Sequence, residues 1–231
     1  MIKGENSEGK CVNCLARSAC VLSVLNGNAL RKTGRIVHQF PCGADEAIFH
    51  QGAPALGAYI LCQGRAKLFF RAQRGKILLL RFCTPGDLLA GVASQEHAVS
   101  AVSVGPSVVS FIDKTRATTL VRQNPELGLE IGRRFAQDGQ RLLQRMADLA
   151  YEGAEEKVTH VLLSLGEEHG VRDEDDLRIN LPLSTRDIAE MVGCSRQTIS
   201  QALHNLSKRN LIQVTRHTIT LTDVEGPREQ G

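Results

Sequence analysis

Three cysteines lie close together near the start of the chain: Cys11, Cys14 and Cys20. Thiolates at this spacing can hold one corner of a metal cluster. The chain has seven cysteines, an odd number, and its first residues, MIKGENSEGKC, are polar and lack the apolar core of a secretory signal. We therefore expect metal or redox chemistry in a reducing cytoplasm, where structural disulfides are rare.

The fourth ligand of such a site is left open by the residue pattern. Cys42, Cys62 and Cys83 all fall in the region of short apolar runs described below, and a carboxylate could serve as well. Cys62 and Cys83 are also typical of plain core residues, because free cysteine packs as a small apolar side chain. A thiol or zinc switch, or no metal role, is the alternative for the three clustered cysteines. Haem is a further alternative, with three candidate axial ligands: His38, His50 and His97.

A second informative group of residues lies near the C-terminus, in the stretch LPLSTRDIAEMVGCSRQTISQALHNL. Ser184 is a good helix N-cap with Asp187 in the capping-box position, Gly193 suits the end of that helix, and Ser195 caps the next. A two-stranded hairpin is predicted for LIQVTRHTITL, which completes the pattern of a winged helix-turn-helix. Apolar residues recur at helical spacing on the two predicted inner faces: Ile188, Ala189 and Val192, then Ile199, Leu203 and Leu206.

The polar side chains at the start of the second helix suit base reading in the DNA major groove. Arg can bridge guanine O6 and N7, Gln can bridge adenine N6 and N7, and phosphate contacts position such a helix without specifying sequence. The alternative is a helical hairpin with a solvated polar face, which the predicted wing disfavours. We expect base reading by Arg196, Gln197, Ser200 and Gln201, and phosphate contacts by Arg186, Ser195, Thr198, Lys208 and Arg216.

Short apolar runs punctuated by glycine fill residues 34–113: IVHQF, AIF, AYILC, AKLFF, ILLLRF, AVSAVSV and SVVSFI. Their spacing is typical of an all-β sandwich or barrel. After Pro125 the period changes to that of a helix of about 25 residues, long enough for a seam between two copies. Gly132, Asp138 and Gly139 interrupt this stripe, and a helix that covers its own β-domain is the alternative. The expected interface residues are Ile131, Phe135, Leu142, Met146 and Leu149.

The pattern predicts four parts: a cysteine arm (1–25), a β-domain (26–120), a dimerisation helix (121–152) and a DNA-binding domain (153–231). The last part begins with a predicted helix over residues 157–165. We expect an acidic loop over residues 167–176 and a short strand at INLPL. The apolar face of the helix is formed by Val158, Val161, Leu162 and Leu165.

Composition limits the classes of function. The 42% hydrophobic content argues against long disorder, and no apolar run approaches the roughly 18 residues that span a bilayer. The absence of Trp disfavours stacking on single-stranded nucleic acid. A cupin-like enzyme or metal-binding protein is the competing class. Because we find no phosphate loop, nucleophile motif or two-His-plus-carboxylate cluster, we expect neither an enzyme nor a membrane protein.

The chain resembles the CRP/FNR family of bacterial transcription regulators over nearly its whole length. The resemblance rests on FHQGAPALGAYILCQGRAKLFF, LLLRFCTPGDLL, the long helix and the helix-turn-helix stretch. It implies an α+β fold with an antiparallel, cupin-like β-roll as sensor domain. It also implies a homodimer on a two-fold symmetric double-stranded DNA site, and contact with RNA polymerase through residues 167–176. A solvated acidic connector is the alternative for these residues. Arg196 matches the family's guanine-reading arginine, whereas Gln197 and Gln201 stand where many members have Glu and Arg.

The resemblance also bears on the signal. Members that bind cAMP neutralise its phosphate with an Arg after the Gly-Asp turn. No Arg lies between Phe82 and Lys114, so we expect no cAMP. The arm is similar to that of the oxygen-sensing FNR branch, in which three such cysteines and a fourth in the β-roll bind a [4Fe–4S] cluster. Ser110 takes the place of that fourth cysteine. The resemblance implies a redox- or oxygen-responsive regulator whose fourth ligand comes from elsewhere.

Overall fold

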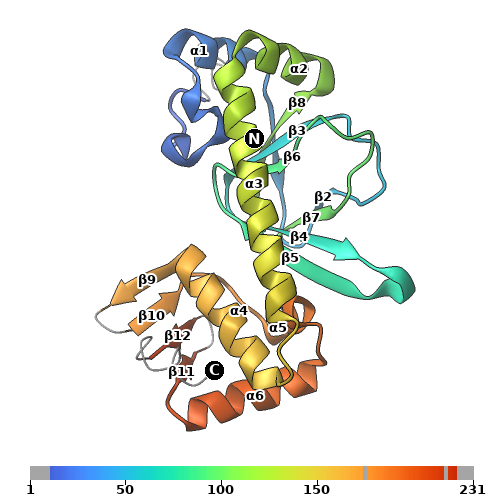
Figure 1. Ribbon diagram of the computed structural model, residues 1–231. Helices are drawn as coiled ribbons and strands as arrows, with labels where there is room; N and C mark the ends of the chain where they lie inside the picture. Colours follow the sequence, from blue (N-terminus) through green and yellow to red (C-terminus); the bar gives the residue numbers. More distant parts are fainter. Residues whose placement is uncertain (1–10, 174–175, 216–217, 223–231) are drawn as a thin grey trace. The chain divides into compact units, whose positions relative to one another are not determined.

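The computed structural model describes residues 11–173, 176–215 and 218–222 of the 231-residue chain (Figure 1). Contacts divide the chain into two compact units, Met1–Asp138 and Gly139–Gly231. The division falls inside the longest helix, α3, Pro125–Asp148. Among the described residues, no helix is long and apolar enough to cross a membrane.

The first unit begins with an arm of two short 3₁₀ helices, Arg17–Ala19 and Val21–Val24, followed by helix α1, Gly27–Ile36. The Asn26 side chain caps α1 by accepting a hydrogen bond from the Ala29 amide at 2.9 Å. The sequence analysis does not predict α1, although Asn26 is a recognisable start signal.

Eight strands form the two antiparallel sheets of a β-roll, which confirms the predicted fold class. One sheet has the order β1-β8-β3-β6 and the other the order β2-β7-β4-β5. All seven apolar runs contribute a strand, and β6 was not predicted. The strands are β1 His38–Cys42, β2 Ala47–Phe49, β3 Gly57–Gln63, β4 Ala66–Arg71, β5 Ile77–Cys83, β6 Leu88–Ala90, β7 Ser100–Ser103 and β8 Ser107–Asp113.

Two apolar cores stabilise the first unit. One joins the arm, α1, the first sheet, helix α2 (Lys114–Gln123) and α3, and it buries Leu22, Leu30, Ile60 and Leu127. The other fills the roll between its two sheets. Because residues of the arm belong to the first core, burial of apolar surface holds the arm on the β-roll.

The second unit holds the helix-turn-helix and a four-stranded sheet of order β11-β12-β10-β9. The predicted inner face of α4 is confirmed, since Val158, Val161, Leu162 and Leu165 are at most 2% exposed. The elements are α4 Ala154–His169, β9 Gly170–Asp173, β10 Asp176–Ile179, α5 Thr185–Val192, α6 Arg196–Lys208, β11 Ile212–Val214 and β12 Ile219–Leu221.

The described residues of the predicted acidic loop, 167–173 and 176, belong to a helix and two strands instead. The first of them complete α4, and the next form β9, which pairs with β10. The predicted strand at INLPL is also wrong, because β10 ends at Ile179. Leu177 and Ile179 alternate as buried residues of β10, whereas Pro182 has no amide to donate to a ladder. Glu167 and Glu168 lie at the end of α4 and Asp173 ends β9, so acidic charge does not mark a loop here.

The helix-turn-helix has the predicted capping. Ser184 and Asp187 form a reciprocal capping box, in which the Ser184 amide donates to Asp187 Oδ2 at 3.1 Å and the Asp187 amide donates to Ser184 Oγ at 3.1 Å. Gly193 ends α5 with φ of 76°, a left-handed conformation that favours glycine. Ser195 accepts from the Thr198 amide at the start of α6. These contacts fix the angle at which α6 leaves the turn.

Candidate functional site

Four cysteines line one pocket in the first unit, which we call the cysteine pocket: Cys11, Cys14, Cys20 and Cys62. The first three come from the arm and the fourth from β3. Arg17, Gln39 and Ser110 also line it. The free space amounts to about 20 Å³, room for a single water. Among the described residues, no three His, Cys, Asp or Glu side chains are grouped to hold one metal ion.

Cys62 lies beside Ser110, which stands where the sequence resemblance implies a fourth cysteine. The two are on neighbouring strands, and Cys62 Sγ is 2.8 Å from Ser110 Oγ. Gln39 Nε2 donates to Ser110 Oγ at 3.2 Å and to Cys62 Sγ at 3.7 Å. The two other candidates, Cys42 and Cys83, are packed in the core between the sheets. Of the three candidate fourth ligands, Cys62 is the one that lines the cysteine pocket.

Burial makes two of the pocket thiols, those of Cys20 and Cys62, weaker acids. It raises the pKa of the Cys20 thiol to about 11, and it also raises the pKa of the Cys62 thiol. Hydrogen bonds from Ser110 and Gln39 offset part of the effect on Cys62. Since the thiolate is the nucleophilic form, both thiols are poor nucleophiles at neutral pH.

The arm packs against the turn between β5 and β6. Gly86 there has φ of 102°, and a Cβ on it would lie 2.7 Å from both the carbonyl carbon and the oxygen of Ala19. The Val21 amide donates to the Gly86 carbonyl at 3.2 Å. Glycine is therefore required at position 86, both for the backbone angle and for this close approach.

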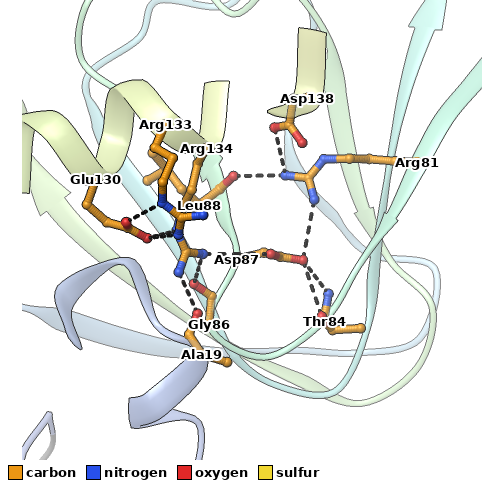
Figure 2. A network of polar contacts seen from close by, with 10 residues as sticks. All are labelled: Ala19, Arg81, Thr84, Gly86, Asp87, Leu88, Glu130, Arg133, Arg134 and Asp138. Carbon is orange, nitrogen blue, oxygen red and sulfur yellow. Dashed lines mark hydrogen bonds and ion pairs between the residues drawn. The ribbon is translucent and has the colours of Figure 1, made fainter. Parts of the chain in front are cut away.

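Figure 2 shows a polar network that joins the arm, the turn and helix α3. Arg134 of α3 donates from Nη2 to the Ala19 carbonyl at 2.7 Å and from Nη1 to the Gly86 carbonyl at 3.2 Å. Its Nε donates to Glu130 Oε1 at 2.7 Å. Arg133 binds the same carboxylate, and the two arginines hold the pKa of Glu130 below its usual value.

The same network continues to the β-roll through Arg81. This guanidinium lies 3.3 Å from Asp87 Oδ2 and 3.5 Å from Asp138 Oδ2 of α3 (Figure 2). Asp87 also accepts a hydrogen bond from the Thr84 amide at 2.8 Å, so the β5–β6 turn holds it in place. The carboxylate of Asp138 therefore faces its own β-roll, where it pairs with Arg81, whereas the sequence pattern places Asp138 in the apolar stripe.

Aromatic rings surround His97 in the β-roll. His97 is buried and stacks on Phe49 with ring centroids 4.2 Å apart, and Tyr59 packs edge-on to it. Burial lowers the pKa of His97, which favours the neutral ring. His38 and His50 are exposed.

The predicted base-reading residues all lie exposed on α6. Gln197 and Gln201 also line an open groove of about 780 Å³ with the first turn of α4. Gln201 Nε2 donates to Asn205 Oδ1 at 2.9 Å, and Asn205 Nδ2 donates to Glu155 Oε1 at 2.5 Å. Sequence analysis missed Asn205 and Glu155, because nothing in the α6 pattern indicates a partner 50 residues earlier on α4.

The predicted phosphate contacts differ in their surroundings. Arg186 is paired with Glu190 at 2.6 Å, which reduces its charge toward DNA. Ser195 and Thr198 bond each other at 2.7 Å as part of the α6 cap, while Lys208 is exposed at the end of α6. Arg216 lies outside the described residues.

Of the five predicted interface residues, Ile131 alone lies off the exposed stripe of α3. Ile131 packs partly buried against the core of the first unit. The most exposed members are Phe135 at 50% and Met146 at 67%. Gly132 and Gly139, where an added Cβ would meet nothing within 4 Å in the described part of the chain, alternate with these residues at three- and four-residue spacing. The resulting exposed seam is Gly132, Phe135, Gly139, Leu142, Met146 and Leu149, of which Leu149 lies just beyond α3.

Comparison with known families bears on both regions. A cyclic nucleotide-binding domain matches residues 39–124, which form most of the β-roll, and a Crp-like helix-turn-helix domain matches residues 156–226. These are the two domains of one class of regulator. The chain is a DNA-binding transcription regulator of the CRP/FNR family. The curated relatives are regulators, so at the level of the family the chain is not an enzyme.

Individual relatives are distant. A CRP-like cAMP-activated global transcriptional regulator of Mycobacterium tuberculosis is 26% identical over 80% of this chain and 84% of its own. The nitrogen fixation regulation protein FixK of Bradyrhizobium diazoefficiens is 24% identical over 92% and 90%. Among solved structures, FixK2 from Bradyrhizobium japonicum has a TM-score of 0.73 at 19% identity, covering 84% of this chain and 96% of its own. A CooA variant from Carboxydothermus hydrogenoformans has a TM-score of 0.77 at 18% identity, covering 94% of both.

The raised thiol pKa values give a first prediction for metal-free protein. At pH 8 a thiol with a pKa of about 11 is ionised to about 0.1%, against about 10% for one at 9.0, so Cys20 should alkylate roughly 100-fold more slowly than in a denatured control. The difference should shrink as the pH rises toward 11. Iodoacetamide labelling followed by peptide mass spectrometry measures it, and equal rates in native and denatured protein would contradict the burial of Cys20.

Proposed function

We propose that this regulator binds DNA as a homodimer under the control of a redox- or oxygen-responsive iron–sulfur cluster in the cysteine pocket. The ligands are Cys11, Cys14, Cys20 and Cys62. The observation that carries the proposal is that one β-roll cysteine lines the same pocket as the three arm cysteines. Four thiolates are the usual ligand set of a [4Fe–4S] cluster, which supplies a redox- and oxygen-sensitive group when bound.

The position of Cys62 explains how the β-roll supplies a ligand although Ser110 has no thiol. The two residues lie side by side on β3 and β8, with their sulfur and oxygen in hydrogen-bond contact. A thiolate on β3 therefore reaches the same pocket as one on β8 would. Gln39 donates to both atoms, so the amide can stabilise a sulfur ligand at either position.

The alternatives fit less well. A zinc ion needs its ligands around one point, and the described residues offer no such group. A thiol switch needs reactive thiolates, whereas burial raises the pKa of Cys20 and Cys62. Haem is disfavoured because His97 is enclosed by aromatic rings. A cAMP effector is disfavoured by the lack of Arg between Phe82 and Lys114.

Cluster ligation predicts a specific pattern among the seven cysteines. Cys62→Ser should lose most of the iron and acid-labile sulfide of protein prepared without oxygen, as should Ser variants of the three arm cysteines, because each iron needs its thiolate. Cys42→Ser and Cys83→Ser are matched controls from the same β-roll, and with Cys194→Ser they should keep both.

Iron and sulfide analysis of the single variants, with the visible spectrum, measures this pattern. Retention of the full content by Cys62→Ser would remove it from the ligand set. Wild-type protein that stays free of iron after anaerobic reconstitution would defeat the cluster proposal and leave DNA binding intact.

Arg196, Gln197, Ser200 and Gln201 are proposed to contact base edges, and Lys208 is proposed to contact phosphate. Arg196→Ala should weaken binding to the specific site by about 1–3 kcal/mol and leave non-specific binding nearly unchanged. Lys208→Ala is the matched control, since a lost phosphate contact weakens binding to all sequences and lowers the salt dependence. Titration of specific and random duplexes decides between the roles. Equal losses on both duplexes for Arg196→Ala would exclude base reading.

The exposed seam of α3 is proposed to pair two copies. Leu142→Glu with Met146→Glu should dissociate the dimer, because the two carboxylates of each chain would be desolvated in an apolar interface. Gln140→Glu, an exposed site off the seam, is the control and should leave the dimer intact. Sedimentation velocity measures the outcome, and an intact double variant would place the interface elsewhere.

The residues proposed to contact RNA polymerase lie in other elements than the loop that the sequence predicts. The described acidic residues among them are Glu167 and Glu168 at the end of α4, Asp173 at the end of β9 and Asp176 at the start of β10. A helix end and two paired strands present these four side chains in a more fixed arrangement than the predicted loop, which suits a protein contact.

A further inference from the structure

We propose that Arg134 is the positioning residue that transmits the state of the cysteine pocket to helix α3. This inference rests on the proposed function, because it concerns how loading of the pocket is sensed. Arg134 lies on the helix whose exposed seam is proposed to pair two copies. Its guanidinium reaches the arm, the β5–β6 turn and its own helix at once, as Figure 2 shows.

The contact with the arm falls on the peptide unit that carries a pocket thiol. Arg134 Nη2 donates to the Ala19 carbonyl, and that carbonyl is bonded directly to the amide nitrogen of Cys20. A shift of the Cys20 backbone therefore changes this hydrogen bond directly. The charge of Arg134 also acts on the Cys20 thiol, since it lowers the pKa against the larger effect of burial.

Loading of the pocket has to move the arm. The free space of about 20 Å³ admits a water and no cluster of several atoms. The arm is already in close contact with Gly86, where a single added carbon would clash with Ala19, so Ala19 and Cys20 have little room to move toward that turn. The displacement is therefore outward, and it stretches or breaks the bond to Arg134.

Loss of that bond removes one of the acceptors that hold the Arg134 guanidinium in place. Its side chain is 19% exposed and Glu130, its helical partner, is 10% exposed, so the guanidinium lies in a partly desolvated site. A charged group in such a site seeks a new acceptor, and it can find one by a change in the side chain or in the helix. Asp138 of α3 also forms an ion pair with Arg81 of the β-roll. The contacts of Arg134 and of Asp138 therefore act on the same segment of α3.

Arg133 supplies a matched control. It is the neighbouring residue and carries the same charge, and its side chain is 56% exposed. Both of its side-chain hydrogen bonds within the described part of the chain go to the Glu130 carboxylate. Arg134→Gln and Arg133→Gln therefore remove the same charge from the same helix. They differ in the contacts with Ala19 and Gly86.

The first measurement is hydrogen exchange of metal-free protein. The arm amides of residues 17–24 should exchange about tenfold faster in Arg134→Gln than in wild type, from loss of a charge-assisted hydrogen bond. Arg133→Gln should match wild type. Equal exchange in the two variants would show that Arg134 does not hold the arm, and would overturn the inference.

The second measurement is the dimer dissociation constant, with and without anaerobic loading by iron and sulfide. Loading should change this constant in wild type and Arg133→Gln by a factor of about 5–150, the usual range of allosteric coupling. In Arg134→Gln, the factor should fall toward one although iron and sulfide content stay at the wild-type level. An unchanged factor would overturn the inference. Wild-type protein that takes up no iron would defeat the cluster proposal instead, while the exchange measurement still decides whether Arg134 holds the arm.

Discussion

The first unit depends on the close contact between the Ala19–Cys20 peptide and Gly86. Without a Cβ at position 86, the arm lies against the β5–β6 turn and the Val21 amide reaches the Gly86 carbonyl. This contact brings Cys20 into the pocket that Cys62 lines from β3. Any larger residue at position 86 would lift the arm and separate the two groups of cysteines. The cysteine pocket is thus a product of one backbone conformation that glycine adopts without strain.

Under the proposed function, burial links metal binding to the protonation of the pocket thiols. Desolvation favours the protonated forms of Cys20 and Cys62, which disfavours their reaction as nucleophiles in metal-free protein. A cationic metal removes the cost of the buried negative charge as it displaces the protons, and its binding therefore becomes linked to pH and to the position of the arm. Because burial keeps these thiols neutral in metal-free protein, ligation by their thiolates would change the local charge strongly.

Sequence periodicity predicted what depends on local pattern and failed where the answer depends on pairing across the chain. The β-roll strands, the capping box at Ser184 and the turn at Gly193 follow from alternation, capping and backbone preference, and the structure has them. The proposal of Cys62 as the fourth ligand rests on its lateral position beside Ser110, which alternation within β3 does not reveal. Which face of α3 stays exposed depends on which face packs on the β-roll, and the helix pattern alone does not show this. Ile131 and Asp138 both lie on the face that packs on the β-roll.

Glu155 sets the direction of a short chain of hydrogen bonds on the recognition helix. A carboxylate only accepts, so Asn205 must turn its Nδ2 toward Glu155 and its Oδ1 toward Gln201. Gln201 donates one of its two Nε2 hydrogens to Asn205, which leaves its Oε1 and its second Nε2 hydrogen for a contact with a base. An acceptor and a donor side by side match adenine N6 and N7, whereas the same pair meets two acceptors on guanine. A free glutamine could reorient for other bases, so the Glu155 carboxylate at the other end of this chain narrows the base reading proposed for Gln201.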